Sequence, residues 1–209
     1  MCMFVVVAMV SAKHCYKKEK NGFSAVIGMV ANNVNVAPGY QLSFTESCGI
    51  AIDYKNQQMS ISYEIIDGGN LYYGQLYAFG ANNTQYVLSN GTCSEMPLSY
   101  PVPSSLPTNF TQLPKVRLGK YKVDVIQFTD TEADTTVQAL YDGEDCAVVS
   151  TLTANNGLDG FAIANYFDYT NKVNPQLFEL PVECQTANVF KLSHAKFHNI
   201  QLPNTVHLL

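Results

Sequence analysis

The chain has 209 residues, 47% of them hydrophobic, and a formal net charge of −5 at pH 7. This composition is enough for one sizeable core and does not require two domains. Only 14% of the residues are charged and Arg117 is the sole arginine, which argues against nucleic-acid binding, because a phosphate backbone requires several clustered basic side chains.

Residues 1–12 form a short, almost continuous apolar run. The run is too short to cross a bilayer, which takes about 20 residues, so we predict no transmembrane segment. Val10 and Ala12 are small residues just before Lys13, as a signal-peptide cleavage site requires. We therefore predict a signal peptide over residues 1–12 and a single domain over residues 13–209. The alternative is a buried first strand.

Strict alternation of apolar and polar residues over 58–65 predicts a strand with one buried and one solvent-exposed face. Residues 67–70 supply a turn, and 71–79 predict a partner strand that is apolar on both faces except at Gln75. Residues 84–89 return as a further strand. Five prolines between 97 and 114 then predict a long surface connection, since proline cannot donate to a sheet ladder.

The second half of the chain predicts more strands, over 121–128, 136–141 and 146–152. Residues 160–169 are apolar and aromatic and fit either a strand or a short helix. Only 187–200 has helical spacing, so a short C-terminal helix is expected. The pattern predicts a mainly β, antiparallel domain of roughly eight strands in two packed sheets.

Removal of the predicted signal peptide leaves five cysteines, which are Cys15, Cys48, Cys93, Cys146 and Cys184. No pair has the spacing of a zinc site or a redox dithiol. Wide spacing in an exported chain favours disulfides, and the odd number leaves one thiol unpaired or bonded to a second chain. Asn82, Asn90 and Asn109 begin N-x-[ST] sequons near turn residues, which predicts glycosylation and a lumenal or extracellular location.

The sequence contains no nucleophile elbow and no phosphate-binding glycine loop, so we predict no catalytic residues and no enzyme. His194 and His198 have the spacing of two ligands on one helix, but two ligands do not make a metal site, and we predict none. Cys48 is the only candidate for a cysteine nucleophile, and that role would need a cleft and a histidine partner. Thirteen tyrosines and eleven phenylalanines, with no tryptophan, fit either a filled core or the rim of a pocket for amphipathic ligands.

Several short blocks together resemble the ependymin-related proteins. They are Thr92-Cys93-Ser94-Glu95-Met96, Glu144-Asp145-Cys146, Phe167-Asp168-Tyr169, Asn174-Pro175-Gln176-Leu177-Phe178 and Pro181-Val182-Glu183-Cys184-Gln185. Their order and approximate spacing match the family across residues 15–190, with the C-terminal block the most specific. The tryptophan usual after the first cysteine is missing, and Cys48 matches no family cysteine.

The resemblance implies two stacked antiparallel sheets enclosing a hydrophobic pocket, similar to bacterial lipoprotein-carrier domains. It implies disulfides between Cys15 and Cys146 and between Cys93 and Cys184. Members of this family are secreted or lysosomal glycoproteins, often homodimers, implicated in binding lipids and calcium and without established enzymatic activity.

We therefore expect a non-enzymatic secreted or lysosomal glycoprotein that binds a lipid or fatty acid between its sheets. Alternation of the predicted strands suggests the pocket walls, which are Met59, Ile61, Tyr63, Ile65, Tyr72, Leu76, Val123, Val125, Val148 and Phe161.

The alternative is a matrix or adhesion glycoprotein that contacts a protein or calcium. Its ion contacts would come from loop carboxylates, which are Asp130, Glu132, Asp134, Asp142, Glu144 and Asp145. Calcium takes about six to eight oxygens, and no contiguous loop has EF-hand spacing. Apart from weak calcium binding under this alternative, no cofactor is expected.

Overall fold

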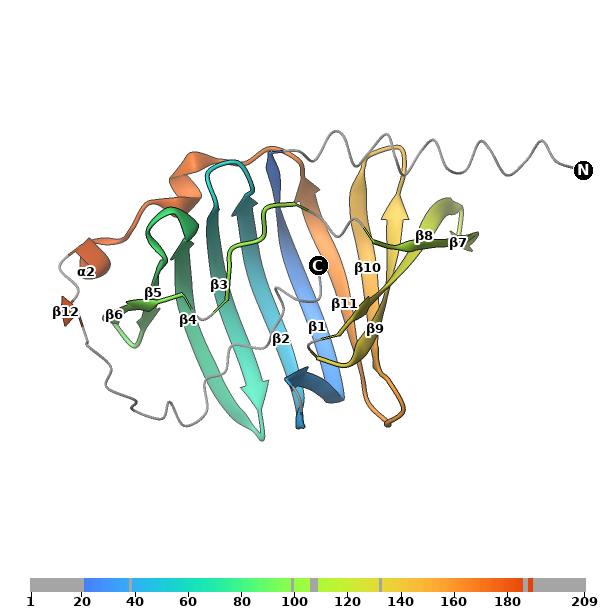
Figure 1. Ribbon diagram of the computed structural model, residues 1–209, viewed down its shortest axis with the longest axis horizontal. Helices are drawn as coiled ribbons and strands as arrows, with labels where there is room; N and C mark the ends of the chain where they lie inside the picture. Colours follow the sequence, from blue (N-terminus) through green and yellow to red (C-terminus); the bar gives the residue numbers. More distant parts are fainter. Residues whose placement is uncertain are drawn as a thin grey trace, which may run out of the picture.

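The computed structural model describes residues 21–37, 39–98, 100–105, 109–131, 133–185 and 188–189. Within these residues the chain is mainly β-strand (Figure 1). The first six strands are β1 (Gly22–Ala37), β2 (Tyr40–Asp53), β3 (Gln58–Asp67), β4 (Asn70–Phe79), β5 (Thr84–Ser89) and β6 (Thr92–Pro97). The others are β7 (Thr111–Leu118), β8 (Tyr121–Asp130), β9 (Thr135–Asp142), β10 (Ala147–Asn155), β11 (Phe161–Thr170) and β12 (Asn188–Val189). The helices are the 3-10 turns η1 (Gly80–Asn82) and η2 (Pro175–Phe178) and the short α2 (Val182–Gln185).

The strands form one sheet in the order β12-β6-β5-β4-β3-β2-β1-β11-β10-β9-β8-β7. All neighbours are antiparallel except β12, which pairs with β6 in parallel. Strands β1–β6 and β7–β11 are two meanders, and pairing of β1 with β11 joins them. The expected antiparallel β fold is confirmed, with one difference. The two expected sheets are two halves of one continuous sheet, because β1 pairs with β2 along one edge and with β11 along the other.

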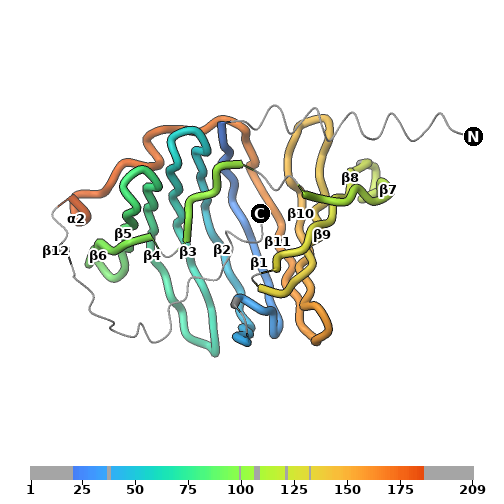
Figure 2. Tube along the Cα trace, viewed as in Figure 1, coloured from blue at the N-terminus to red at the C-terminus, as the bar shows by residue number. Residues whose placement is uncertain are grey.

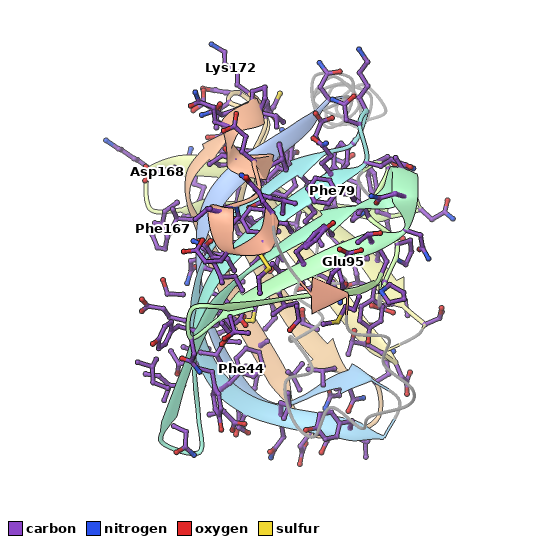
Figure 3. All side chains as sticks on the ribbon, turned by 90° about the vertical axis from the view of Figure 1, so that its left-hand side faces the viewer. Phe44, Phe79, Glu95, Phe167, Asp168 and Lys172 are labelled. Atoms are coloured by element: carbon purple, nitrogen blue, oxygen red, sulfur yellow. A yellow bond between two sulfur atoms is a disulfide. The ribbon has the colours of Figure 1, made fainter. Side chains whose placement is uncertain are left out.

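One face of the sheet, called here the inner face, carries the main core. Cross-strand register brings Ile27, Cys48, Tyr63 and Tyr166 to this face from four strands. The intervening residues point to the opposite, outer face, where Phe167 is 56% exposed. In Figure 3, Phe167 projects sideways from the ribbon. The period of two in each strand therefore separates a buried apolar side from a partly exposed one.

Strands β3, β4 and β5 lie where alternation predicted them, and 160–169 is a strand (β11), not a helix. No strand was predicted over residues 22–53, where β1 and β2 lie. The sequence of β1 does not alternate between apolar and polar residues, because Val26 and Val30 on its outer side are apolar like the inner residues.

The proline-rich connection differs from the expectation in two ways. Val102 is only 6% exposed and belongs to the core, so this segment is not purely surface; Figure 1 shows it crossing in front of the central strands. Strand β7 begins at Thr111 and contains Pro114. Pro114 is tolerated there because β7 is an edge strand and its register with β8 is irregular between Leu113 and Val116.

The C-terminal part of the domain crosses from one half of the sheet to the other. After β11 the chain passes through η2 and α2 to the far side of the sheet, beside β5 and β6 (Figure 2). The short helix is therefore at Val182–Gln185. Within the predicted helix over 187–200, Asn188–Val189 is strand β12, and the remaining residues lie outside the described part.

Candidate functional site

The inner face contains most of the predicted ligand-binding residues. Met59, Ile61, Tyr63 and Ile65 alternate along β3, and each is at most 7% exposed. The remaining predicted residues in the same core cluster are Leu76 and Val148. These six residues are therefore brought to one face of the sheet, as alternation requires.

Phe161 lies on the outer face, away from these six residues. It is 41% exposed, whereas its neighbour Ala162 is 2% exposed and points inward. Tyr72 is cross-strand to Ile65 but is 38% exposed, because it lies beside the turn that ends the β3–β4 hairpin.

Val123 and Val125 are buried, but also on the outer side. Asp124, between them, is cross-strand to Tyr141 and therefore points to the inner face with that residue. The structure therefore places Val123 and Val125 on the side opposite the predicted wall residues of β3.

The middle of the inner face is lined by small side chains. Ala31, Ala162 and Thr153 are in register across three neighbouring strands. The next inner row contains Ala164 and Thr151, which are also directly opposed. These residues are at most 5% exposed. Larger apolar residues of β2 and β3 border this row, so the face has a floor of small residues beside a wall of large ones.

Glu46 is a functional candidate that the sequence analysis missed. It is 3% exposed and lies on the inner face of β2, cross-strand to Met29 and Ile65. Its Oε2 atom has no hydrogen-bond partner. Burial raises the pKa of Glu46 to about 7, and a hydrogen bond with the Cys48 thiol opposes this shift. The inward alternation of Phe44, Cys48 and Ile50 was the signal that could have revealed it.

Cys48 is a free, buried cysteine beside Glu46. Burial, followed by the Glu46 carboxyl, raises the pKa of its thiol well above the usual range. A cysteine nucleophile needs the opposite shift, so Cys48 has the environment of an inert thiol. Tyr166, cross-strand to Ile27 on the same face, is hydrogen-bonded to Thr151, and burial raises its pKa.

The outer face carries a separate groove of about 570 Å³. Its lining includes Ser47, Gly49, Ser62, Glu64 and Tyr73, whose side chains are small, polar or aromatic. The lining also includes the apolar Val26 and Leu88, so this groove mixes polar and apolar side chains, whereas the inner face is mainly apolar. A second hollow of about 480 Å³ lies at the start of β10 and the end of β11.

Cys93 and Cys184 form the predicted disulfide, with their Cα atoms 5.1 Å apart and 91 residues between them in sequence. The bond fixes α2 against β6. Cys146 is also disulfide-bonded, and its predicted partner Cys15 lies outside the described residues. The sequon residues Asn82, Asn90 and Asn109 are all exposed, and their glycosylation stays a prediction.

Within the described ranges, no group of three or more His, Cys, Asp or Glu side chains could hold a metal ion. Asp142 Oδ1 accepts the Glu144 and Asp145 backbone N–H groups at 2.8 and 3.3 Å, and Asp130 Oδ1 accepts that of Ala133 at 3.0 Å. His194, His198 and Glu132 lie outside the described residues. None of the described helices is long and apolar enough to span a membrane.

Two solved structures share the fold. An uncharacterised conserved protein from Thermus thermophilus has a TM-score of 0.56 and 9% identity, covering 85% of this chain and 96% of that one. LprF from Mycobacterium bovis has a TM-score of 0.52 and 10% identity, covering 86% of this chain and 98% of that one. At such low identity the likeness is one of fold alone.

An uncharacterised protein of Dictyostelium discoideum is 32% identical over 174 residues, covering 80% of this chain. The chain spans 55% of the length of that relative. Residues 14–206 match the family described as "Ependymin domain, amoebozoa". The chain therefore belongs to the ependymin family.

Proposed function

We propose that this protein is a non-enzymatic binding protein for an apolar ligand, a lipid in particular, which lies on the inner face of the sheet. The observation that carries the proposal is the arrangement of that face. A floor of small side chains, including Ala162 and Ala164, adjoins large apolar residues such as Ile50 and Ile61. A row of small side chains bordered by large apolar ones is a shape that fits an apolar chain, and the apolar lining favours a ligand portion without charge.

Family membership and fold support a binding role. The disulfides and the exposed sequons support export from the cell. The Cys93–Cys184 bond and the bonded Cys146 suit an oxidising compartment, and all three sequon asparagines are exposed for modification. We propose a secreted glycoprotein on these grounds. Residence in lysosomes and assembly into homodimers are further proposals from the family resemblance.

Native mass spectrometry of the protein purified from its own host tests the proposal. We expect a retained apolar molecule that organic solvent extracts. Ala164→Leu adds bulk to the floor and should lower retention about tenfold, since overpacking an apolar site costs about 1–3 kcal/mol. Asn165→Leu adds bulk to the outer face of the same strand and should retain the ligand fully. A wild-type protein that neither carries nor takes up an apolar molecule contradicts the proposal.

A further inference from the structure

Glu46 is an acidic residue in the centre of an apolar face. It lies on β2, which is flanked on both sides by long strands, and its cross-strand neighbours Met29 and Ile65 are apolar. Of the described residues, the buried acidic ones are Glu46 and Asp124. Asp124 has a cationic partner, Lys115. Glu46 is therefore the polar feature that most distinguishes the proposed ligand-binding face.

The hydrogen-bonding capacity of Glu46 is only partly used. The Cys48 thiol, at the next inward position of the same strand, forms a hydrogen bond with the carboxyl group of Glu46. The Oε2 atom of that group has no hydrogen-bond partner. A buried polar atom without a partner costs about 1–3 kcal/mol, and more when it is charged. A folded protein tolerates such an atom most readily where a ligand or a bound water molecule supplies the missing hydrogen bond.

Tyr63 provides a second group of the same kind on the same face. It is cross-strand to Cys48, is 3% exposed, and its hydroxyl has no hydrogen-bond partner. Its ring extends over Gly74, since a Cβ atom added at residue 74 would lie 2.6 Å from the Tyr63 hydroxyl. Two incompletely bonded polar groups therefore face inward from adjacent strands, within a wall that is otherwise apolar.

We propose that Glu46 Oε2 binds the polar end of the inner-face ligand, and that this end is a hydrogen-bond donor, a hydroxyl or an amine, rather than a carboxylate. The inference rests on the proposed function and specifies the class of lipid. A fatty-acid carboxylate would bring a second acid to a buried carboxyl group with no cation among its identified interactions. A hydroxyl donates directly to Oε2, and an ammonium group also neutralises the ionised carboxylate.

The test uses three probes with the same saturated chain, namely hexadecylamine, hexadecanol and hexadecanoic acid. The full-length protein, freed of bound lipid, is offered an equimolar mixture at neutral pH, and native mass spectrometry gives the ratio of bound species. We expect the amine and the alcohol each to bind about tenfold more tightly than the acid, as one buried hydrogen bond to a charged or partly charged group predicts.

Three variants test whether Glu46 causes the preference for the amine and the alcohol over the acid. Glu46→Leu should bind all three probes within about twofold, since the acceptor is gone and the apolar wall remains. Glu46→Gln keeps the shape and adds an N–H donor, so it should regain affinity for the acid. Glu64→Gln, on the outer face of β3, is the matched control and should keep the wild-type ratio.

The possible outcomes separate the two proposals. Equal binding of the three probes to the wild type, as expected if a water molecule completes Glu46, overturns the inference and leaves apolar binding intact. A preference that persists in Glu46→Leu also overturns it. If no probe binds to any of the proteins, the proposed function and the inference both fail.

Discussion

The two buried carboxyl groups of this domain have opposite surroundings. Asp124, 1% exposed on β8, forms an ion pair of 2.9 Å with Lys115 Nζ and accepts a hydrogen bond of 3.4 Å from Gln112 Nε2. Glu46, 3% exposed on β2, has an oxygen without any partner. Equal burial therefore does not imply equal roles: Asp124 is held by its own hairpin, whereas Glu46 is available to another molecule.

Position in the sheet explains the difference. Asp124 is next to β7, an edge strand, where Lys115 keeps its side chain 40% exposed while its ammonium group reaches inward. Glu46 is in the middle of the sheet, where strands β1 and β3 contribute Met29 and Ile65 beside it. Near an edge of the sheet, a long cationic side chain can reach a buried carboxyl group while part of its length stays in water. A carboxyl group in the centre of the sheet is out of reach of such a side chain, so its hydrogen-bond partners must come from neighbouring inner residues or from a ligand.

The largest expected effect is a pH dependence of stability that comes from Glu46. Its pKa is about 7 in the folded protein and 4.5 without burial, so between these values the folded state binds more protons than the unfolded state. The free energy of unfolding should therefore fall as the pH rises from about 4.5 to above 7. At about 1.4 kcal/mol per pH unit over this interval, the loss is about 3.5 kcal/mol.

Urea unfolding of the ligand-free protein across this pH range measures the effect, with Glu46→Gln as the reference. The difference between the two proteins isolates Glu46, because burial raises the pKa values of Cys48, Tyr63 and Tyr166 and these groups titrate above the range. Parallel pH profiles for wild type and variant would show that Glu46 is not buried as described.

A second effect, of about 2 kcal/mol, should come from breaking the Asp124 ion pair. Lys115→Met removes the cation and leaves a buried carboxylate with weaker compensation, which lowers the free energy of unfolding at neutral pH. The half-exposed lysine keeps the loss below that of a fully buried pair. Lys122→Met, at an exposed position of the same hairpin, is the control and should change stability by no more than about 0.5 kcal/mol. If the two substitutions lower the free energy of unfolding equally, Lys115 does not stabilise Asp124 specifically, and Asp124 no longer differs from Glu46 in having a cationic partner that matters for stability.

The sequence predicted those parts of the fold that alternation alone determines. Strand β3 was correct because every second residue from Met59 to Ile65 is apolar and the others are polar. Strand β1 was missed because its outer side is also apolar at Val26 and Val30. Glu46 lies in an alternating stretch that could have been recognised. However, its lack of a partner depends on which residues β1 and β3 place beside it, and only the long-range register determines that.

The smallest effect concerns two buried tyrosines and should have opposite signs. Tyr63 and Tyr77 are 3% and 8% exposed, but only the Tyr77 hydroxyl has an identified partner, donating to Gln75 Oε1 at 2.9 Å. Tyr63→Phe removes an unsatisfied hydroxyl and should stabilise the ligand-free protein by about 1 kcal/mol, whereas Tyr77→Phe should destabilise it by a similar amount. Thermal unfolding of both variants, before and after loading with hexadecanol, measures the pair. If the hydroxyl of Tyr63 contributes to ligand binding, the gain from Tyr63→Phe should shrink on loading, because the wild type then recovers the hydrogen bond that it lacks when empty. A gain that is unchanged by loading would restrict the polar part of the site to Glu46.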